Sequence, residues 1–273
     1  MNKLTVYGLP LNPTSLLEHL EGGSFCVSYA TRQRLGKQLD QAIRLVGDQG
    51  MLMIDNGAFS HHKAGGSSMD DDYIEAFATW AQGILDRCPQ AIVVIPDVIG
   101  GTEAENAQLI LEWPLERARS MAVWHLDESI DSLLHRCVDH EWIAFGSSGQ
   151  YWQIGTEAWH ARVREALAAI DAWAAESDGA YVRPRIHMMR AQSQAHLYAF
   201  DSSDSCNVAI NHSRQLRLGE TFPAFAGRVD AKIQASAGPA SEHQRKRPML
   251  SGWEFEQAMA QLLEPELELR EAA

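Results

Sequence analysis

The sequence predicts an irregular (β/α)8 barrel of the TIM type with a reduced C-terminal extension. Eight short, nearly continuous apolar runs occur along the chain, as expected for parallel strands that are buried on both faces. Helix-like stretches lie between most of these runs, and this alternation is typical of a parallel α/β protein. Eight strand signals in succession favour a closed barrel over an open sheet.

The expected strands are residues 4–8, 25–30, 51–57, 91–98, 121–127, 142–149, 185–191 and 196–202. The expected helices are residues 33–46, 71–87, 103–115, 129–137 and 156–175. The second of these helices has apolar residues at helical spacing, and SSMDDD before it supplies a cap and first-turn acids. The joins at 8–25 and 191–196 are short for full helices, so we expect the barrel to be irregular there.

The predicted barrel occupies residues 1–214, and residues 215–273 are predicted to form a C-terminal loop and helix that pack on it. Residues 207–250 are rich in Gly, Pro, Ser, Gln and Arg and show no clear periodicity. Ser251 and Glu254 then form a capping-box pattern, which predicts the start of a last helix.

The charge and hydropathy of the chain restrict its partners and location. No apolar run approaches the ~20 residues of a membrane span, and the N-terminal segment has no apolar core of a secretory signal. We therefore expect a cytoplasmic protein with no membrane partner. The net charge of −13 requires a local basic patch if the ligand is a nucleic acid. The candidate residues for such a patch are Arg183, Arg185, Arg214, Arg217 and Arg245–Arg247.

The cysteines predict neither a disulfide framework nor a metal site. Cys26, Cys88, Cys137 and Cys206 are far apart and form no C-x-x-C pair. We expect reduced thiols, no bound metal and no cofactor.

Acids and glycines end several of the expected strands. In TIM barrels the active site lies at the C-terminal ends of the strands. The residues at these ends are Asp55, Asp97, Asp127, Gly146 and Asp201. Each acid alone is also explained by turn or N-cap chemistry. Together they predict a site, because clustered carboxylates are costly unless they are paired or hydrogen-bonded.

The order of five motifs, DNGAFS, PDVIGG, AFGSSG, IHMMR and YAFDSSDSC, resembles the tRNA-guanine transglycosylase superfamily. The similarity covers about residues 25–214 and is closest to the short 7-deazaguanine DNA transglycosylases of phages and bacteria. The resemblance implies an enzyme that replaces guanine in DNA with a free 7-deazaguanine base of the preQ0 type. It also implies a covalent aspartyl-glycosyl intermediate, in which a carboxylate bonds to C1′ of the sugar.

Under this resemblance Asp201 is the expected nucleophile, because it directly follows an apolar run, and Asp204 is the alternative in a shifted alignment. Asp55 is the expected general acid toward the leaving base and general base toward the incoming one. The residues expected to bind the base are Asp97, Gly146, Ser147, Phe59, Met188 and His125.

The expected roles of these base-binding residues differ. Asp97 would accept hydrogen bonds from N1–H and the exocyclic amine of a guanine-type ring. Backbone N–H groups of Gly146 and Ser147 would face the ring's O6, and Met188 or Met189 would sandwich the ring with Phe59. Methionines on a barrel strand are more often plain core residues than ligand contacts, and His187 is expected to be a hydrogen-bonded core residue.

Functions other than base exchange in DNA are also consistent with the sequence. The tRNA enzymes carry a C-x-C-x-x-C…H zinc site, whereas Cys206 and His212 stand alone here, so tRNA is disfavoured as a substrate. One alternative is a ribosyltransferase or hydrolase with the same site chemistry acting on a free 7-deazaguanine nucleoside or nucleotide, or on tRNA. Another is a non-catalytic partner subunit. The sequence also leaves open whether the protein acts with a helper protein or as a homodimer.

Overall fold

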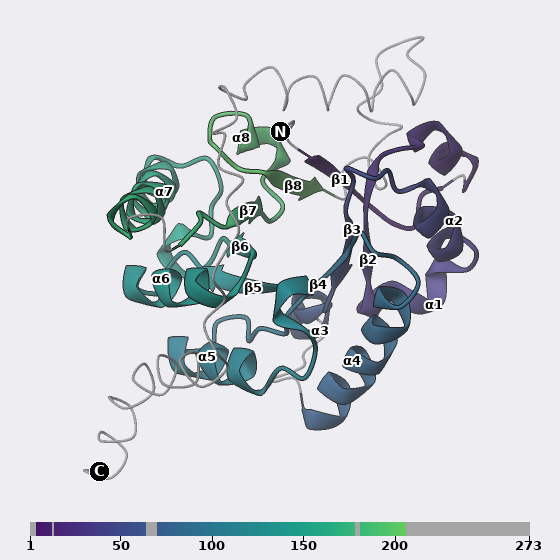
Figure 1. The fold of residues 1–273 in the computed structure, drawn as a ribbon, viewed down its shortest axis with the longest axis horizontal. Helices are drawn as coiled ribbons and strands as arrows, with labels where there is room; N and C mark the ends of the chain where they lie inside the picture. The colour runs from purple at the N-terminus through teal and green to yellow at the C-terminus, as the bar shows by residue number, and fades with distance from the viewer. Residues whose placement is uncertain (1–3, 13, 64–69, 178–180, 206–273) are drawn as a thin grey trace.

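The computed structural model is a closed barrel of eight parallel strands, in the order β1 to β8, which confirms the predicted fold class. It describes residues 4–12, 14–63, 70–177 and 181–205. Figure 1 shows the barrel with the helices α2, α4, α5, α6 and α7 around its outside. The strands are β1 (Leu4–Gly8), β2 (Ser24–Ser28), β3 (Leu52–Asp55), β4 (Ala91–Val94), β5 (Ser120–His125), β6 (Trp142–Gly146), β7 (Arg185–Met188) and β8 (Ser202–Ser205).

The helices follow the strands as predicted, with irregular joins at two places. The α-helices are α1 (Arg32–Leu35), α2 (Gln38–Leu45), α3 (Ala58–Lys63), α4 (Asp71–Leu85), α5 (Glu103–Glu112), α6 (Ile130–Asp139), α7 (Glu157–Glu176) and α8 (Gln192–Ala195). The 3₁₀ helices are η1 (Thr14–Leu20), η2 (Tyr29–Thr31), η3 (Arg117–Arg119) and η4 (Gly149–Tyr151). Only η1 joins β1 to β2, and only the short α8 joins β7 to β8.

The ends of the helices follow the local sequence. Asp70 caps α4 by accepting a hydrogen bond from the backbone N–H of Tyr73, and Thr102 and Glu105 form a capping box at the start of α5. The expected helix over 33–46 is interrupted at Gly36, whose φ of 51° is in the left-handed region and ends α1.

The prediction of the eighth strand is wrong in position. The apolar run over 196–200 forms a turn after α8, and β8 begins only at Ser202. Phe200 is buried against Phe145 on the outer surface of the barrel, with ring centroids 6.0 Å apart. The run is apolar because its side chains pack beneath a turn, and not because it forms a strand. The polar sequence SSDS forms the strand because its backbone pairs with β1 and β7.

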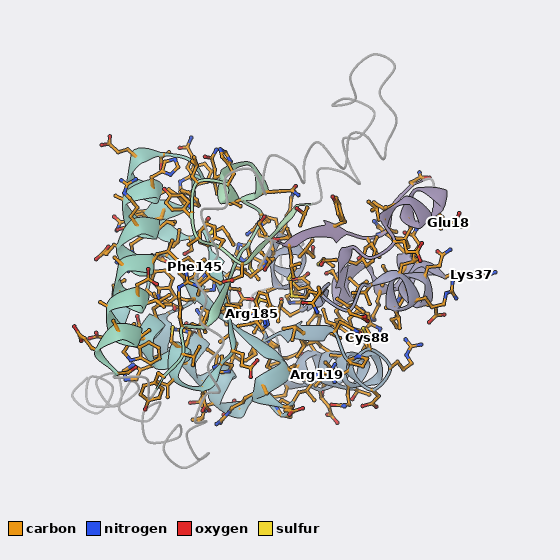
Figure 2. All side chains as sticks on the ribbon, turned by 45° about the horizontal axis from the view of Figure 1, so that its top comes forward. Glu18, Lys37, Cys88, Arg119, Phe145 and Arg185 are labelled. Atoms are coloured by element: carbon orange, nitrogen blue, oxygen red, sulfur yellow. The ribbon has the colours of Figure 1, made fainter. Side chains whose placement is uncertain are left out.

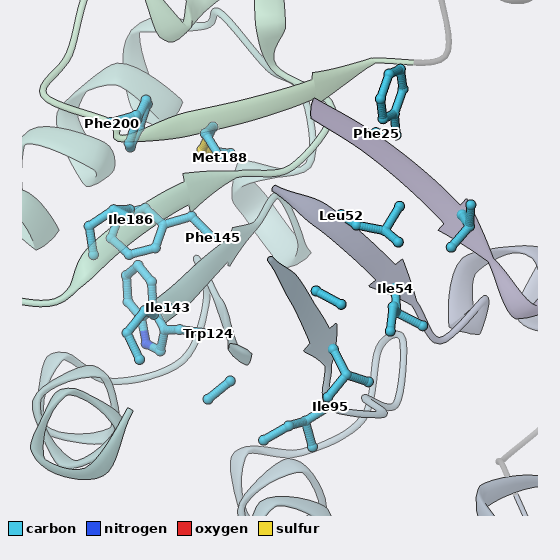
Figure 3. Close-up of a cluster of buried hydrophobic side chains, with 14 of the residues drawn as sticks. Phe25, Leu52, Ile54, Ile95, Trp124, Ile143, Phe145, Ile186, Met188 and Phe200 are labelled. Atoms are coloured by element: carbon cyan, nitrogen blue, oxygen red, sulfur yellow. The ribbon is translucent and has the colours of Figure 1, made fainter. Parts of the chain in front are cut away.

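The core has two layers because successive strand residues point to opposite faces of the barrel wall. The outer layer lies between the strands and the helices, and Figure 3 shows its members from Phe25 through Phe145 to Phe200. Side chains fill the space around the barrel wall on all sides in Figure 2. The inner layer is smaller and includes Met53, Val123 and Ala144. The next inward positions along these strands therefore lie at the barrel mouth.

The expectations about membrane segments and cysteines can be compared with the described residues, whereas those about the C-terminal extension cannot. Within the described ranges, no helix has the length and apolar character to cross a bilayer. Cys26, Cys88 and Cys137 are buried, and no disulfide occurs in the part of the chain that the structure describes. Cys206, the basic residues from Arg214 onward and the proposed extension over 215–273 lie outside the described residues.

Candidate active site at the barrel mouth

Strand alternation brings residues from three strands to the C-terminal mouth of the barrel. Met53, Val123 and Ala144 face the barrel interior. Asp55, His125 and Gly146 each follow one of these residues by two positions, so they face the same interior one layer higher. The sequence prediction that these three residues converge agrees with this geometry.

Asp204 reaches the same interior from β8, where it is buried beside His187 of β7. His187 Nε2 lies 3.1 Å from Asp204 Oδ1, and the other ring nitrogen, Nδ1, lies 2.8 Å from the hydroxyl of Ser202. The backbone N–H of Arg190 also donates to Asp204 Oδ1, at 2.8 Å. Burial works to raise the pKa of Asp204, but the hydrogen bonds and positive charges of His187 and Arg190 outweigh it, so the pKa is lowered.

The pKa of Asp55 is shifted in the opposite direction from that of Asp204. Burial raises the pKa of Asp55 from 3.8 to about 6, the charges of Asp204 and Asp97 add to the rise, and hydrogen bonds from Ser28 and the backbone of Gly57 oppose it. Ser28 is the register partner of Asp55 on β2. Asp55 therefore holds a proton up to about pH 6 next to a carboxylate that is ionised there.

Asp97 lies just beyond β4 and is held between β3 and β5. The side-chain amide of Asn56 donates to Asp97 Oδ1 at 3.0 Å and to the carbonyl of Ile95 at 2.8 Å. The other carboxylate oxygen lies 3.1 Å from Nε2 of His125 in an ion-pair contact that is not aligned as a hydrogen bond. Burial works to lower the pKa of His125, but Asp97 and Glu128 outweigh it and the pKa is raised.

We call Asp55, Asp97, His125, His187 and Asp204 the mouth cluster. The charges of Asp204 and Asp97 both act to raise the pKa of Asp55, which agrees with the placement of the three acids at the same end of the barrel. Sequence reasoning assigned His187 to the core and gave Asn56 no role. Alternate residues of a strand face the same side of a sheet. This rule, applied to β7 and β8, would have predicted that His187, Ser202 and Asp204 all face the interior.

A second buried polar network supports the mouth cluster from behind, and the sequence reasoning missed it. The amide of Asn106 donates to Glu128 Oε1 at 3.0 Å, and the guanidinium of Arg136 lies 2.8 Å from Glu128 Oε2. Arg136 is fully buried, and burial lowers its pKa, although the charge of Glu128 opposes this. This network fixes the loop after β5 and so the position of His125, whose backbone N–H lies 3.4 Å from Glu128 Oε2.

The structure corrects the expected location of Asp201. Because β8 begins at Ser202, Asp201 lies at the N-terminal end of that strand, at the opposite end of the barrel from the mouth. Its carboxylate accepts a hydrogen bond from the backbone N–H of Ile186 at 2.8 Å and lies 3.4 Å from the guanidinium of Arg183. These contacts join the starts of β7 and β8, which is a structural role.

The expectation for Met188 also changes. Met188 belongs to the outer layer of the core and is fully buried between the strands and the helices, so its side chain points away from the barrel interior. Its neighbour Met189 packs against the inner layer instead. The hydroxyl of Ser147 accepts a hydrogen bond from Nε1 of Trp159 on α7 at 3.0 Å, so this side chain is directed toward the helix layer, while the expected role of the Ser147 backbone N–H stays a prediction.

The rim of the mouth carries exposed aromatic and basic groups. Phe59 follows β3 and is 46% exposed, and Trp152 follows β6 and is 69% exposed. The guanidinium of Arg190, just after β7, lies over the ring of Phe59 at 4.0 Å. A Cβ at Gly146 would lie 3.5 Å from His125 Nδ1, so the glycine leaves the space beside this nitrogen open.

Neither a metal site nor the groove between α4 and α5 competes with this location in the described residues. No group of three or more His, Cys, Asp or Glu side chains in the described ranges is arranged to hold a metal ion. A groove of about 730 Å³ lies between α4 and α5, lined by apolar residues such as Ile74 and Trp113. It contains no residue of the mouth cluster and has no paired acid and base.

Comparison with known proteins adds no family assignment to this geometry. A scan of the sequence against protein-family models finds no matching family, and a search of curated proteins finds no significant match. The functional conclusion therefore depends on the chemistry of the mouth cluster and on the motifs of the sequence.

Proposed function

We propose that the protein is a base-exchange transglycosylase that replaces guanine in DNA with a 7-deazaguanine base, and that Asp204 is its nucleophile. One observation carries this proposal. Asp55, with a pKa near 6, and Asp204, with a lowered pKa, are coupled at the barrel mouth. This combination suits cleavage of an N-glycosidic bond by covalent catalysis, in which an ionised carboxylate attacks C1′ and a protonated group serves the leaving base.

The proposed first step is attack by Asp204 on C1′ of the sugar. Oδ1 accepts hydrogen bonds from His187 and Arg190, and no group in the described ranges bonds to Oδ2, so Oδ2 is the attacking atom. A bond forms between Oδ2 and C1′ as the bond from C1′ to N9 breaks, and the electron pair of that bond passes to guanine. Asp55 donates its proton to the leaving ring. In the second step Asp55 removes a proton from the incoming base, which attacks C1′ and releases Asp204.

The proposed reader of the purine ring is the pair His125 and Asp97. Each oxygen of Asp97 has one protein contact and keeps a lone pair, which suits the N1–H and amine donors of a guanine-type ring. The raised pKa of His125 favours its donor form, and its Nδ1 lies beside the open space at Gly146. This nitrogen is the proposed donor to O6 of the ring.

The decisive experiment is a labelling assay. The full chain is incubated with radiolabelled guanine or preQ0 and, in parallel, with duplex DNA, tRNA and free nucleosides. We expect label to enter DNA. Absence of label from every acceptor would overturn base exchange, and label in free nucleosides alone would favour the small-substrate alternative that the net charge of −13 supports.

Matched variants test the nucleophile. Asp204→Asn removes the attacking carboxylate, whereas Asp201→Asn makes the same change at the other end of β8. We expect Asp204→Asn to lower exchange by a factor of about 10³ or more, as for removal of a catalytic nucleophile, and Asp201→Asn to retain it. Acid quenching without acceptor base should leave a protein–DNA ester that hydroxylamine cleaves. Full exchange by Asp204→Asn would refute the assignment.

A further inference from the structure

Arg190 and Phe59 form a bridge across the barrel mouth. Phe59 follows β3 and Arg190 follows β7, and these strands are four positions apart in the closed order of eight, so they lie on opposite sides of the barrel. The guanidinium carbon of Arg190 nevertheless lies only 4.0 Å from the centre of the Phe59 ring. The two side chains together therefore span the barrel mouth, the end of the barrel at which Asp55 and Asp204 lie.

The backbone of Arg190 connects this bridge to the proposed nucleophile. Its φ of 56° makes it the one residue other than glycine with a positive φ in the ranges that the structure describes. In this conformation its N–H donates to Asp204 Oδ1 at 2.8 Å. A left-handed conformation is unfavourable for arginine, so the fold holds the residue at a set position beside the reacting carboxylate.

The guanidinium of Arg190 retains its capacity to bind an anion. Stacking on Phe59 uses the face of the planar group, whereas its N–H donors point outward in the plane. No carboxylate in the described part of the chain lies within ion-pair distance of Arg190, and the residue is exposed. Asp204 is the acid whose charge interacts with it. In a chain with a net charge of −13, a cation of this kind at the mouth suits an anionic substrate.

We propose that Arg190, supported by Phe59, binds a phosphate group of the nucleotide whose base is exchanged. This inference rests on the proposed function, because it places the sugar of the substrate at Asp204. The phosphate on the 5′ oxygen of that sugar lies a few bonds from C1′, within reach of a side chain whose backbone bonds to the nucleophile. The substrate class is then a phosphate-bearing nucleotide unit, as in DNA, and not a free nucleoside.

The test compares binding of three probes to the full chain by calorimetry: deoxyguanosine, deoxyguanosine 5′-monophosphate and a single-stranded pentanucleotide with one central guanine. We expect both phosphate-bearing probes to bind about tenfold or more tightly than deoxyguanosine, as for hydrogen bonds to a charged group. Equal binding of all three would overturn the phosphate site. Tight binding of the monophosphate without binding of the pentanucleotide would overturn DNA as the source of the phosphate.

Arg190→Asn removes the charge and keeps a residue type that tolerates the left-handed backbone. We expect it to abolish the preference for phosphate. The matched control is Arg185→Asn, at the other end of β7, where an exposed guanidinium lies 5.4 Å from the Trp142 ring. It should retain the preference, and Phe59→Leu should weaken it.

These experiments can refute the phosphate site and the base-exchange function independently of each other. A phosphate preference that depends on Arg190, without any base exchange, would remove the proposed function and keep the phosphate site. Base exchange with an unchanged phosphate preference in Arg190→Asn would remove the phosphate site and keep the function. Retained thermal stability of Arg190→Asn shows that the comparison concerns binding.

Discussion

Asp55→Asn tests whether the mouth cluster raises the pKa of Asp55. A rise from 3.8 to about 6 corresponds to about 3 kcal/mol between the two protonation states. Because the folded-state pKa is the higher one, Asp55 contributes stability that is fully present below about pH 4 and is lost as the pH rises through about 6. The asparagine variant has no such group, so its stability relative to the wild type should improve by about 2.5 kcal/mol between pH 4 and pH 7.5.

The assay is urea unfolding of wild type and Asp55→Asn at both pH values, with the difference in the free energy of unfolding compared between them. The hydrogen bonds from Ser28 and Gly57 favour the ionised form of Asp55 and are already included in its raised pKa, so the change with pH reports the net shift. Asp48→Asn, which makes the same change at an exposed loop position, is the matched control. A change for Asp55→Asn below about 1 kcal/mol, or of opposite sign, would refute the reasoning about burial and neighbouring charge.

Two further predictions concern the support of the site. Arg136→Met removes one partner of a fully buried ion pair and leaves Glu128 uncompensated, so we expect a loss of about 3–5 kcal/mol in unfolding free energy; a loss below about 1 kcal/mol would show that this network is not structural. Gly146→Ala adds a methyl group 3.5 Å from His125 Nδ1, an ordinary contact distance, so the fold should be retained while guanine binding weakens. Calorimetry with free guanine measures this effect, and unchanged affinity would contradict the role given to His125.

The sequence was sufficient for the architecture because hydrophobic burial acts locally on the pattern of residues. Buried strands such as β5 and β6 appear in the sequence as apolar runs, and the SSMDDD segment, which contains the cap Asp70, marks the start of α4. The strand-end acids Asp55 and Asp97 followed from this pattern together with the rule that barrel sites lie at the C-terminal ends of strands.

The eighth strand shows where local pattern fails. Its apolar neighbours pack beneath a turn, while SSDS enters the barrel through backbone pairing with β1 and through the contact of Asp204 with His187. Pairing between distant segments leaves no mark in the local hydropathy of either one. The sequence prediction took the apolar run as the strand and therefore placed Asp201 at the mouth. The acid that lies there is Asp204, three residues later.

By itself, the sequence determined that this chain forms a parallel eight-stranded barrel and that acids end several of its strands. Only the tertiary structure decided that Asp204, and not Asp201, faces the interior, that Asp97 is held by Asn56 and His125, and that Arg190 contacts Phe59 at the mouth. The physical reason is that hydropathy reports burial, whereas register and side-chain direction, which depend on partners far away in the chain, decide which polar groups meet.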